Sequence, residues 1–282
     1  MSMVLKSSLV SVDWLYTHLN DNNLILLDCT ISKVTANKSH SVIKNKQCIK
    51  GAVFFDIKNV FSDISAEFPN TVLPPNVFEK KAQNLGVNKD SCIICYDDLG
   101  MYSSPRVWWN FKLMGFDNIA VLDGGLPKWK ENNYPIEKPR KHQLKKGNFI
   151  ARYHPKKVKF TSDVIEAIHN DNIIIADARS KGRFYGSATE PRKGVKSGHI
   201  PNSVSLPYSE IQKDGLLLSK EELKSIFNQI ILKKEELIFS CGTGITASVL
   251  ALAAEIAGLK NYAVYDGSWT EWGSTNNLPI AL

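Results

Sequence analysis

The sequence predicts an α/β protein with two tandem domains of the same fold, each a mainly parallel β-sheet flanked by helices. Three observations lead to this fold class. The chain has 282 residues, enough for two domains that each bury a core. Several segments occur twice in the same order. Short, almost continuously apolar strands alternate with helical patterns, which is typical of strands buried on both faces of a parallel sheet.

The repeated segments begin with an apolar strand that ends in an aspartate, at residues 24–28 and again at 173–177. A short helical pattern precedes each strand, and Ser11 and Thr161 stand where an N-cap is expected. Two further pairs of strands follow in the same order, 92–97 with 237–241 and 120–125 with 263–268. Because the matching positions lie about 145 residues apart, two homologous domains are expected.

The expected domains span residues 1–137 and 158–282, joined by a linker at 138–157 that contains proline, glycine and many cations. Nine Lys and Arg and no acidic residue fall between Lys138 and Lys159, so this segment accounts for the formal net charge of +7. We interpret the segment as a solvated linker, with weak contact to an anionic partner as the alternative. A uniformly basic nucleic-acid-binding surface would look different, so no nucleic-acid partner is expected.

Composition predicts a soluble globular protein in a reducing compartment. Apolar residues make up 43% of the chain and charged residues 22%, and no apolar run is long enough to cross a bilayer. The segment from Met1 to Val12 lacks the pattern of a signal or transit peptide. Five cysteines at irregular spacing do not resemble a disulfide framework. We therefore expect a cytoplasmic protein with free thiols and no membrane partner.

One of the cysteines, Cys241, lies where an α/β fold places its chemistry. An apolar strand leads into Cys-Gly-Thr-Gly, and an Ala- and Leu-rich helix follows. Ligands bind at the carboxyl ends of the strands in such a sheet. Gly242 and Gly244 let the backbone curl so that several N–H groups point inward, and the N-terminus of the helix adds positive charge. This cradle favours the nucleophilic thiolate; a small buried hydrophobic residue is the alternative interpretation.

Motifs along nearly the whole chain belong together. They are Tyr102–Trp109, Asp177-Ala178-Arg179, Gly198-His199-Ile200-Pro201, Ala263–Trp272 and the loop Cys241-Gly242-Thr243-Gly244-Ile245-Thr246-Ala247. Together they resemble the tandem-domain rhodanese family, and specifically its 3-mercaptopyruvate sulfurtransferase subgroup. In that subgroup neutral residues follow the cysteine of the loop, as they do here. Thiosulfate-using rhodaneses carry basic residues there, which suit a dianionic donor.

The resemblance implies a sulfurtransferase that moves sulfane sulfur from 3-mercaptopyruvate to a thiol such as thioredoxin, or to cyanide, through a Cys241 persulfide, with release of pyruvate. Arg183 and Arg192 are expected to bind the carboxylate and carbonyl of this small-molecule donor, since a guanidinium fork can hold a carboxylate through two bonds. Further substrate-binding residues are expected in the loop, namely Gly242, Thr243, Gly244, Ile245 and Thr246. No metal or organic cofactor is expected.

The two repeats differ at the position of Cys241. Asp97 stands where Cys241 stands in the second repeat, and a carboxylate cannot carry sulfane sulfur. The first domain is therefore expected to be catalytically inactive. The triad of Asp, His and loop hydroxyl proposed for some family members is also not supported, because Lys58 occupies the place of its Asp and residues 69–74 contain no His. Thr243 would then act with water, backbone groups or Arg192.

Other functions remain as alternatives. A thiosulfate:cyanide sulfurtransferase differs only in its donor, and a regulatory or binding rhodanese module would carry no reaction. A phosphatase of related fold would need Arg six residues after the cysteine, where this chain has Ala247. Cys92 and Cys95 lie three positions apart within a strand and would point to opposite faces, so core packing is expected for them rather than a zinc site.

Overall fold

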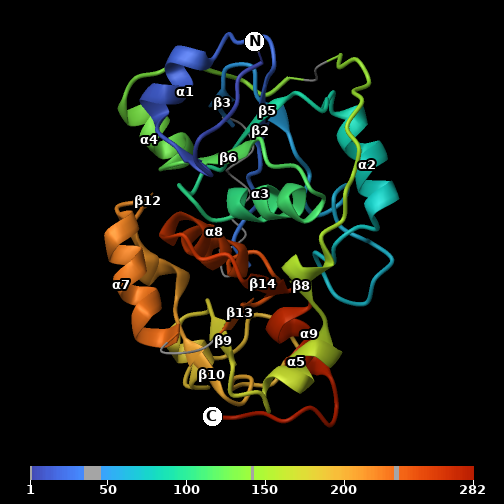
Figure 1. Cartoon of the computed structure of the whole chain (residues 1–282), viewed down its shortest axis with the longest axis vertical. Helices are drawn as coiled ribbons and strands as arrows, with labels where there is room; N and C mark the ends of the chain where they lie inside the picture. Colours follow the sequence, from blue (N-terminus) through green and yellow to red (C-terminus); the bar gives the residue numbers. More distant parts are fainter. Residues whose placement is uncertain (1, 35–45, 141–142, 232–234) are drawn as a thin grey trace. The chain divides into compact units, whose positions relative to one another are not determined.

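The computed structural model describes residues 2–34, 46–140, 143–231 and 235–282, and the chain forms two compact units (Figure 1). The first unit contains Met1–Phe61, Leu73–Tyr153 and Asp214–Leu216, and the second contains Ser62–Val72, His154–Lys213 and Leu217–Leu282. The sequence divides the chain at its linker, whereas the compact units also exchange two internal segments. The segment Ser62–Val72, which lies within the first repeat, is part of the second unit.

The first unit is built around a five-stranded parallel sheet. The strand order is β1-β6-β5-β2-β4, and every neighbouring pair in it is parallel. The strands are β1 (Leu9–Val10), β2 (Leu24–Asp28), β4 (Val53–Phe54), β5 (Cys92–Tyr96) and β6 (Ile119–Leu122). A separate antiparallel pair joins β3 (Cys48–Ile49) to β7 (Ile136–Glu137). The central strand β5 is buried along its whole length, as its continuous apolar sequence requires.

Helices cover both faces of this sheet. The helices α1 (Val12–His18) and α4 (Gly125–Glu131) lie next to each other (Figure 1) and share one core cluster with residues of β2, β5 and β6. The helices α2 (Pro75–Asn84) and α3 (Ser104–Leu113) meet through Phe78 and Phe111, whose rings pack edge to face at 5.0 Å. This arrangement buries the apolar strands on both sides.

The second unit repeats the same topology. Its strands follow the order β10-β9-β13-β14-β8, again all parallel. They are β8 (Val158–Lys159), β9 (Ile173–Asp177), β10 (Ser203–Ser205), β13 (Glu236–Ser240) and β14 (Tyr262–Tyr265). Each strand occupies the place of its counterpart in the first sheet, with β13 matching β5 and β14 matching β6. The predicted fold class of two tandem α/β domains with parallel sheets is confirmed.

The helices of the second unit also lie on two faces. The helices α5 (Thr161–Ala167) and α9 (Ser268–Ser274) share a core cluster with β9, β13 and β14, while α7 (Lys220–Ile231) and α8 (Ala247–Ala257) pack against each other. Shorter elements complete the unit: η2 (Pro155–Lys157), α6 (Lys181–Phe184) and η3 (Tyr208–Ile211). The strands β11 (Gln212–Lys213) and β12 (Leu216–Leu217) pair in a small two-stranded sheet.

One of the two expected helix caps is confirmed and the other is wrong. The Ser11 side chain accepts a hydrogen bond from the Trp14 amide at 3.1 Å, as an N-cap should. Thr161 lies inside α5, which begins one residue earlier than expected. The Phe160 amide instead donates to the carboxylate of Asp163 at 2.7 Å. Asp163, in the first turn of the helix, thus accepts the hydrogen bond of the Phe160 amide, which has no partner within the helix.

The interpretation of the basic segment as a solvated linker is wrong at Phe149, while Asn148, Ile150 and Arg152 beside it are exposed. The Phe149 side chain is 1% exposed and lies among the aromatic rings of the first unit. Backbone amides anchor the stretch on the same unit, with Gly147 N donating to Gln83 O at 2.8 Å and Arg152 N donating to Met114 O at 2.8 Å. Residues 141 and 142 of the segment lie outside the described residues.

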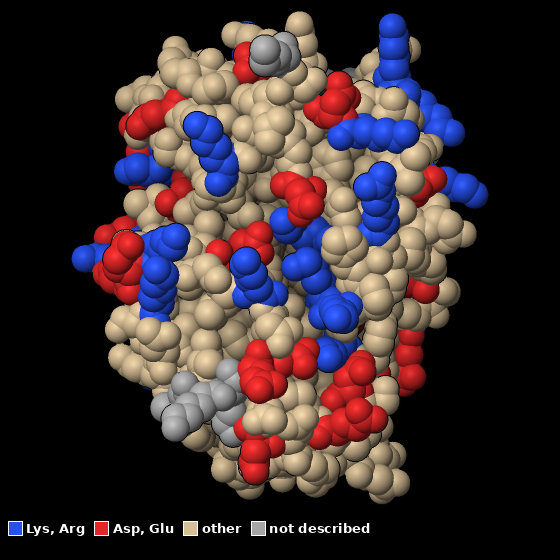
Figure 2. Space-filling model, in the orientation of Figure 1, with Lys and Arg blue, Asp and Glu red and all other residues tan. Residues whose placement is uncertain are grey.

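Across the described ranges no helix is both long and apolar enough to cross a membrane. On the face drawn in Figure 2, Lys and Arg side chains, several of which run together near the middle, alternate with Asp and Glu, and uncharged residues cover the rest. That face is therefore not uniformly basic, in line with the local origin of the net charge. The absence of nucleic-acid and membrane partners stays a prediction.

Candidate active site

The loop that follows β13 positions the predicted nucleophile. Cys241 comes directly after the last residue of β13 and is 1% exposed, and the loop then runs to Thr246, the N-cap residue of α8. Gly244 adopts a φ of +76°, a conformation that glycine reaches without steric cost. The loop therefore turns sharply between a strand end and a helix start, as the two glycines predict.

The start of α9 holds this loop from the side. The Ser268 hydroxyl accepts hydrogen bonds from the amides of Cys241 at 3.2 Å and Gly244 at 3.1 Å, and it donates to Tyr265 O at 2.8 Å. Two backbone bonds add to the clamp: Trp269 N donates to Cys241 O at 2.9 Å and Thr270 N donates to Gly242 O at 3.0 Å. The loop geometry is thus fixed by an element that is remote in sequence.

Ser268 reaches this position at a conformational cost. Its φ is +51°, a left-handed value that glycine adopts freely and asparagine and aspartate tolerate, but that is costly for other residues because of their Cβ. Gly125 occupies the matching position of the first unit with a φ of +53°. The role of Ser268 is not among the sequence-based expectations; the signal in the sequence is a serine where the first repeat has a glycine. The hydroxyl is what the strained serine adds to the loop.

Both predicted arginines lie over the loop. A methyl group built on Gly242 would be 3.4 Å from Nη2 of Arg183 and 3.9 Å from Nη1 of Arg192. The two guanidinium groups therefore converge beside the residue that follows Cys241. Arg183 is on the short helix α6, and Arg192 is in the segment that follows it. The structure brings together the cysteine and the two cations that the sequence singles out.

Glu190 orients Arg183. Its carboxylate accepts two bonds from that guanidinium, from Nε at 3.0 Å and from Nη2 at 2.6 Å, and its side chain is 4% exposed. The same carboxylate accepts a bond from Nη1 of Arg179 at 2.8 Å. Arg179 is fully buried, forms an ion pair with Asp177 and lies 4.3 Å from the centroid of the Trp269 ring. Asp177, Arg179 and Trp269 belong to the sequence motifs named above, whereas Glu190 and its orienting contact emerge only from the structure.

A residue from an unexpected segment contacts the loop hydroxyl. Asn70 Nδ2 donates a hydrogen bond to Thr243 Oγ1 at 2.9 Å, and both side chains are buried. The segment Ser62–Val72 is anchored nearby, because the Val72 amide donates to Asp266 Oδ2 at 2.9 Å. Residues 69–74 contain no histidine that could serve a triad. The structure shows that an asparagine from that stretch reaches the hydroxyl instead.

The matching loop of the first unit is closed by its own carboxylate. Asp97 is fully buried, and its Oδ2 accepts bonds from the amides of Tyr102, Ser103 and Ser104 at 2.8–2.9 Å. Oδ1 accepts a further bond from the Leu99 amide at 3.0 Å. An anionic side chain thus occupies the ring of backbone donors that a loop after a strand provides. The first unit fills with Asp97 the place that the second unit gives to a thiol.

The other cysteines lie in the core of the first unit. Burial raises the pKa of Cys48 to about 11 and that of Cys92 to about 12, and it also raises the pKa of Cys29. These thiols stay protonated at neutral pH and are poor nucleophiles there. No group of three or more His, Cys, Asp or Glu side chains in the described part of the chain could hold a metal ion.

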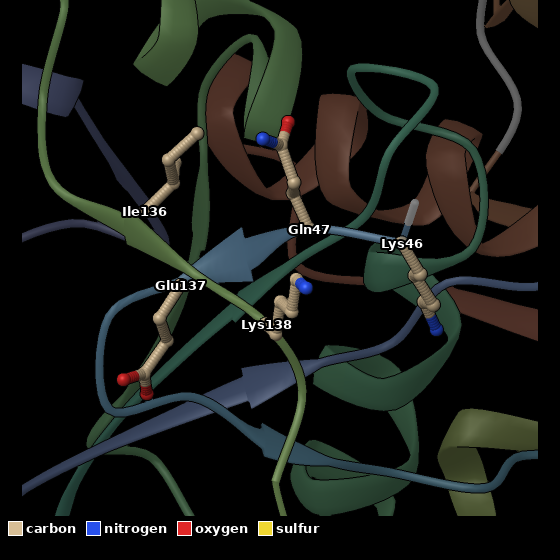
Figure 3. A pocket seen from close by; sticks show the side chains of 5 residues that line it. All are labelled: Lys46, Gln47, Ile136, Glu137 and Lys138. Atoms are coloured by element: carbon tan, nitrogen blue, oxygen red, sulfur yellow. The ribbon is translucent and has the colours of Figure 1, made fainter. Parts of the chain in front are cut away.

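A cavity of about 470 Å³ lies in the first unit, lined by residues at β3 and β7 and beside them (Figure 3). The lining residues are Lys46, Gln47, Ile136, Glu137 and Lys138. Glu137 is already engaged there, since its Oε1 accepts a bond from the Gly51 amide at 2.9 Å. None of the predicted site residues lines this cavity.

Comparison with known proteins identifies one family for both repeats. The rhodanese-like domain family matches residues 11–132 and 161–275, one match for each repeat. The chain belongs to the rhodanese-like family. Its two rhodanese-like domains are the two repeats that the sequence predicts, and the predicted family is confirmed.

Two curated relatives of this rhodanese-like protein carry the name of a sulfurtransferase, and a solved sulfurtransferase structure matches its fold. The 3-mercaptopyruvate sulfurtransferase of Escherichia coli (strain K12) is 34% identical over 275 residues, covering 96% of this chain and 96% of the relative. The thiosulfate/3-mercaptopyruvate sulfurtransferase 2 of Arabidopsis thaliana is 36% identical over 295 residues, covering 96% and 85%. The crystal structure of SseA from Escherichia coli matches with a TM-score of 0.82 and 32% identity, covering 94% of this chain and 99% of SseA.

Proposed function

We propose that this rhodanese-like protein is a 3-mercaptopyruvate sulfurtransferase whose nucleophile is Cys241. The observation that carries the proposal is the convergence of two guanidinium groups on Gly242, the residue next to Cys241. A donor with one carboxylate and an adjacent ketone presents oxygens on neighbouring carbons, which suits two such cations. The names of the relatives support the same reaction.

In the proposed first step the Cys241 thiolate attacks the sulfur of 3-mercaptopyruvate. A sulfur–sulfur bond forms and the carbon–sulfur bond breaks, with its electron pair passing to the carbonyl oxygen as an enolate. The hydrogen of the substrate thiol ends on the methyl group of pyruvate, and Cys241 is left as a persulfide anion. Arg183 and Arg192 hold the substrate carboxylate and stabilise the enolate oxygen, because fixed cations stabilise charge that develops in the reaction.

Loop residues bind the reacting groups in this proposal. The backbone from Gly242 to Thr246, including Gly244 and Ile245, surrounds the sulfur, and the hydroxyls of Thr243 and Thr246 supply short polar groups. The amides of Cys241 and Gly244 are held by Ser268, which keeps the loop in one conformation. The persulfide then passes its sulfur to a thiol, with a thioredoxin-like protein as the proposed acceptor, or to cyanide. No cofactor takes part, and a cytoplasmic location stays a prediction.

Thiosulfate is the alternative donor, and one relative carries both donors in its name. The loop after Cys241 has no basic side chain, so a second negative charge on the donor would find no cation within the loop itself. This favours the monoanionic donor. The first domain is proposed to be inactive, since Asp97 fills its loop with a carboxylate.

The test is turnover of the full chain with each donor at matched concentrations, alongside Cys241→Ser. The wild-type protein should use 3-mercaptopyruvate more efficiently than thiosulfate, and mass spectrometry should find one added sulfur atom on Cys241. Cys241→Ser should lose both turnover and the added mass. Cys92→Ser is the matched control for a cysteine away from the loop and should retain both. Turnover by Cys241→Ser would refute the nucleophile, and preference for thiosulfate would refute the donor.

A further inference from the structure

We propose that Asn70 is a positioning residue of the sulfur-transfer site, whose amide group makes the Thr243 hydroxyl a neutral hydrogen-bond donor toward the substrate. This inference rests on the proposed function and deepens it. It concerns a residue that the first repeat contributes to the compact unit holding Cys241. Thr243 is the group that would touch the substrate, and Asn70 acts through it.

The contact between the two side chains is short and protected from water. Asn70 Nδ2 lies 2.9 Å from Thr243 Oγ1, and the residues are 8% and 6% exposed. A hydrogen bond in such surroundings is stronger than one at the surface, and losing one partner leaves the other poorly satisfied. Thr243 lies two residues after Cys241 in the same loop. The bond therefore fixes a hydroxyl close to the proposed sulfur nucleophile.

The segment that carries Asn70 is held in place at several points. The backbone φ of Asn70 is +66°, a conformation in which asparagine, aspartate, histidine and glycine are the residues most often found. Asp63 N donates to Thr71 O at 2.9 Å, and Thr71 Oγ1 donates to Phe68 O at 2.8 Å. Val72 is tied to Asp266 in turn. The turn thus presents the amide in a fixed direction.

The direction of this hydrogen bond decides what the hydroxyl can do. A hydroxyl has one hydrogen to donate and two lone pairs that accept. Since the amide N–H occupies a lone pair, the Thr243 hydrogen is left to donate elsewhere, and donation into the oxygen strengthens it as a donor. Such a donor can stabilise the enolate oxygen that forms when the carbon–sulfur bond breaks. No proton leaves the hydroxyl, because a side-chain amide does not accept one at neutral pH.

Charged groups near the loop come from several elements, and Cys241 lies two residues before Thr243 in the loop itself. Arg183 and Arg192 lie at Gly242, Glu190 is bound to Arg183, and Asp266 is bound to the Val72 amide. The Thr243 hydroxyl accepts its hydrogen bond from the Asn70 amide and not from any of these four charged groups. A change at Asn70 should therefore be felt in catalysis specifically through Thr243.

A double-mutant cycle on the full chain tests the coupling, with kcat and KM for 3-mercaptopyruvate as the readouts. We expect Asn70→Gly, which tolerates the positive φ, to lower kcat about tenfold with KM changed less than twofold. Thr243→Ala should lower kcat about a hundredfold, the loss typical of a donor to a developing oxyanion. The double variant should fall no further than Thr243→Ala, since Asn70 acts only through that hydroxyl. Losses that multiply would overturn the proposal, as would wild-type kcat in Asn70→Gly.

A pH profile separates this role from a merely structural one. Asn70→His places a titrating group, with an ordinary pKa of about 6.5, against the hydroxyl and is compatible with the left-handed backbone. Only its neutral form can accept a hydrogen bond from Thr243, so the ratio of its kcat/KM to that of wild type should change around pH 6.5. The change should vanish in Asn70→His combined with Thr243→Ala. A flat ratio in the folded single variant would contradict the proposal.

Two controls keep the outcome decisive. Asn202→Gly removes another asparagine amide at positive φ in the same unit, where it donates to Ile168 O, and it should leave kcat unchanged. If Asn70→Gly does not fold, Asn70→Asp keeps the turn but cannot donate, and it should lose more than tenfold in kcat; wild-type kcat there would overturn the proposal. Turnover by Cys241→Ser would refute the proposed function, whereas an additive cycle with intact persulfide formation refutes only the role of Asn70.

Discussion

Removing the charge of Glu190 should shift donor preference toward thiosulfate. The carboxylate is 2.6 Å from Nη2 of Arg183, and that atom is 3.4 Å from the position of a methyl group on Gly242. The negative charge therefore lies within about 6 Å of the loop, close to where a donor would bind. It offsets part of the positive charge that two arginines bring to the site. Glu190→Gln removes the charge and keeps the shape and one acceptor oxygen.

The magnitude follows from Coulomb's law. Thiosulfate carries one negative charge more than 3-mercaptopyruvate, so the repulsion from Glu190 is greater by one unit charge. At about 6 Å and an effective dielectric constant of about 20, one such pair amounts to roughly 3 kcal/mol. Arg183 is 17% exposed, and solvent reduces the effect. We expect Glu190→Gln to decrease the ratio of kcat/KM for mercaptopyruvate to kcat/KM for thiosulfate by a factor of about 10 to 100.

The assay measures kcat/KM for both donors in Glu190→Gln and in Glu210→Gln. Glu210 pairs with Lys181 at the surface of the same unit, so its change removes the same charge at an exposed place and should leave the ratio near the wild-type value. Using a ratio cancels any general loss caused by looser packing of Arg183. An unchanged ratio in a folded Glu190→Gln protein would show that this carboxylate does not influence the choice of donor.

Two further predictions concern Ser268 and the buried thiols. Ser268→Gly removes the hydroxyl that accepts from two loop amides, so kcat should fall about tenfold. Ser268→Ala loses the same hydroxyl and should melt at a lower temperature than Ser268→Gly, because alanine keeps the backbone strain of about 1 kcal/mol that glycine relieves. Wild-type kcat in Ser268→Gly would refute the clamp. Burial raises the pKa of Cys92 from 9.0 to about 12, so the folded chain keeps a proton that the unfolded chain loses in this interval. Stability should therefore fall as pH rises above about 9, and Cys92→Ala should lessen the fall in urea unfolding at pH 8 and pH 10; an identical fall in both proteins would contradict it.

Much of the fold could be predicted because it follows from local pattern. The strands ending at Asp28 and Asp177 are continuous apolar runs, and their recurrence predicts both the tandem arrangement and the parallel sheets. The helix cap at Thr161 is wrong because the helix begins at Thr161 itself, where the Asp163 carboxylate accepts a hydrogen bond from the preceding Phe160 amide. The basic stretch near Phe149 was read as solvated from its charges, while one aromatic side chain within it packs into the core of the first unit.

The candidate site also contains residues that the sequence singled out and residues that only the structure revealed. The sequence by itself singled out Cys241, because it stands where a strand ends in a glycine-rich loop, and the family resemblance singled out Arg183 and Arg192; their roles stay predictions. Only the tertiary structure decided which side chains orient them. Ser268, Glu190 and Asn70 reach the loop or its arginines from other elements of the second unit, through hydrogen bonds of 2.6–3.2 Å. Such contacts depend on how separate elements pack, and no local pattern of residues encodes their distance.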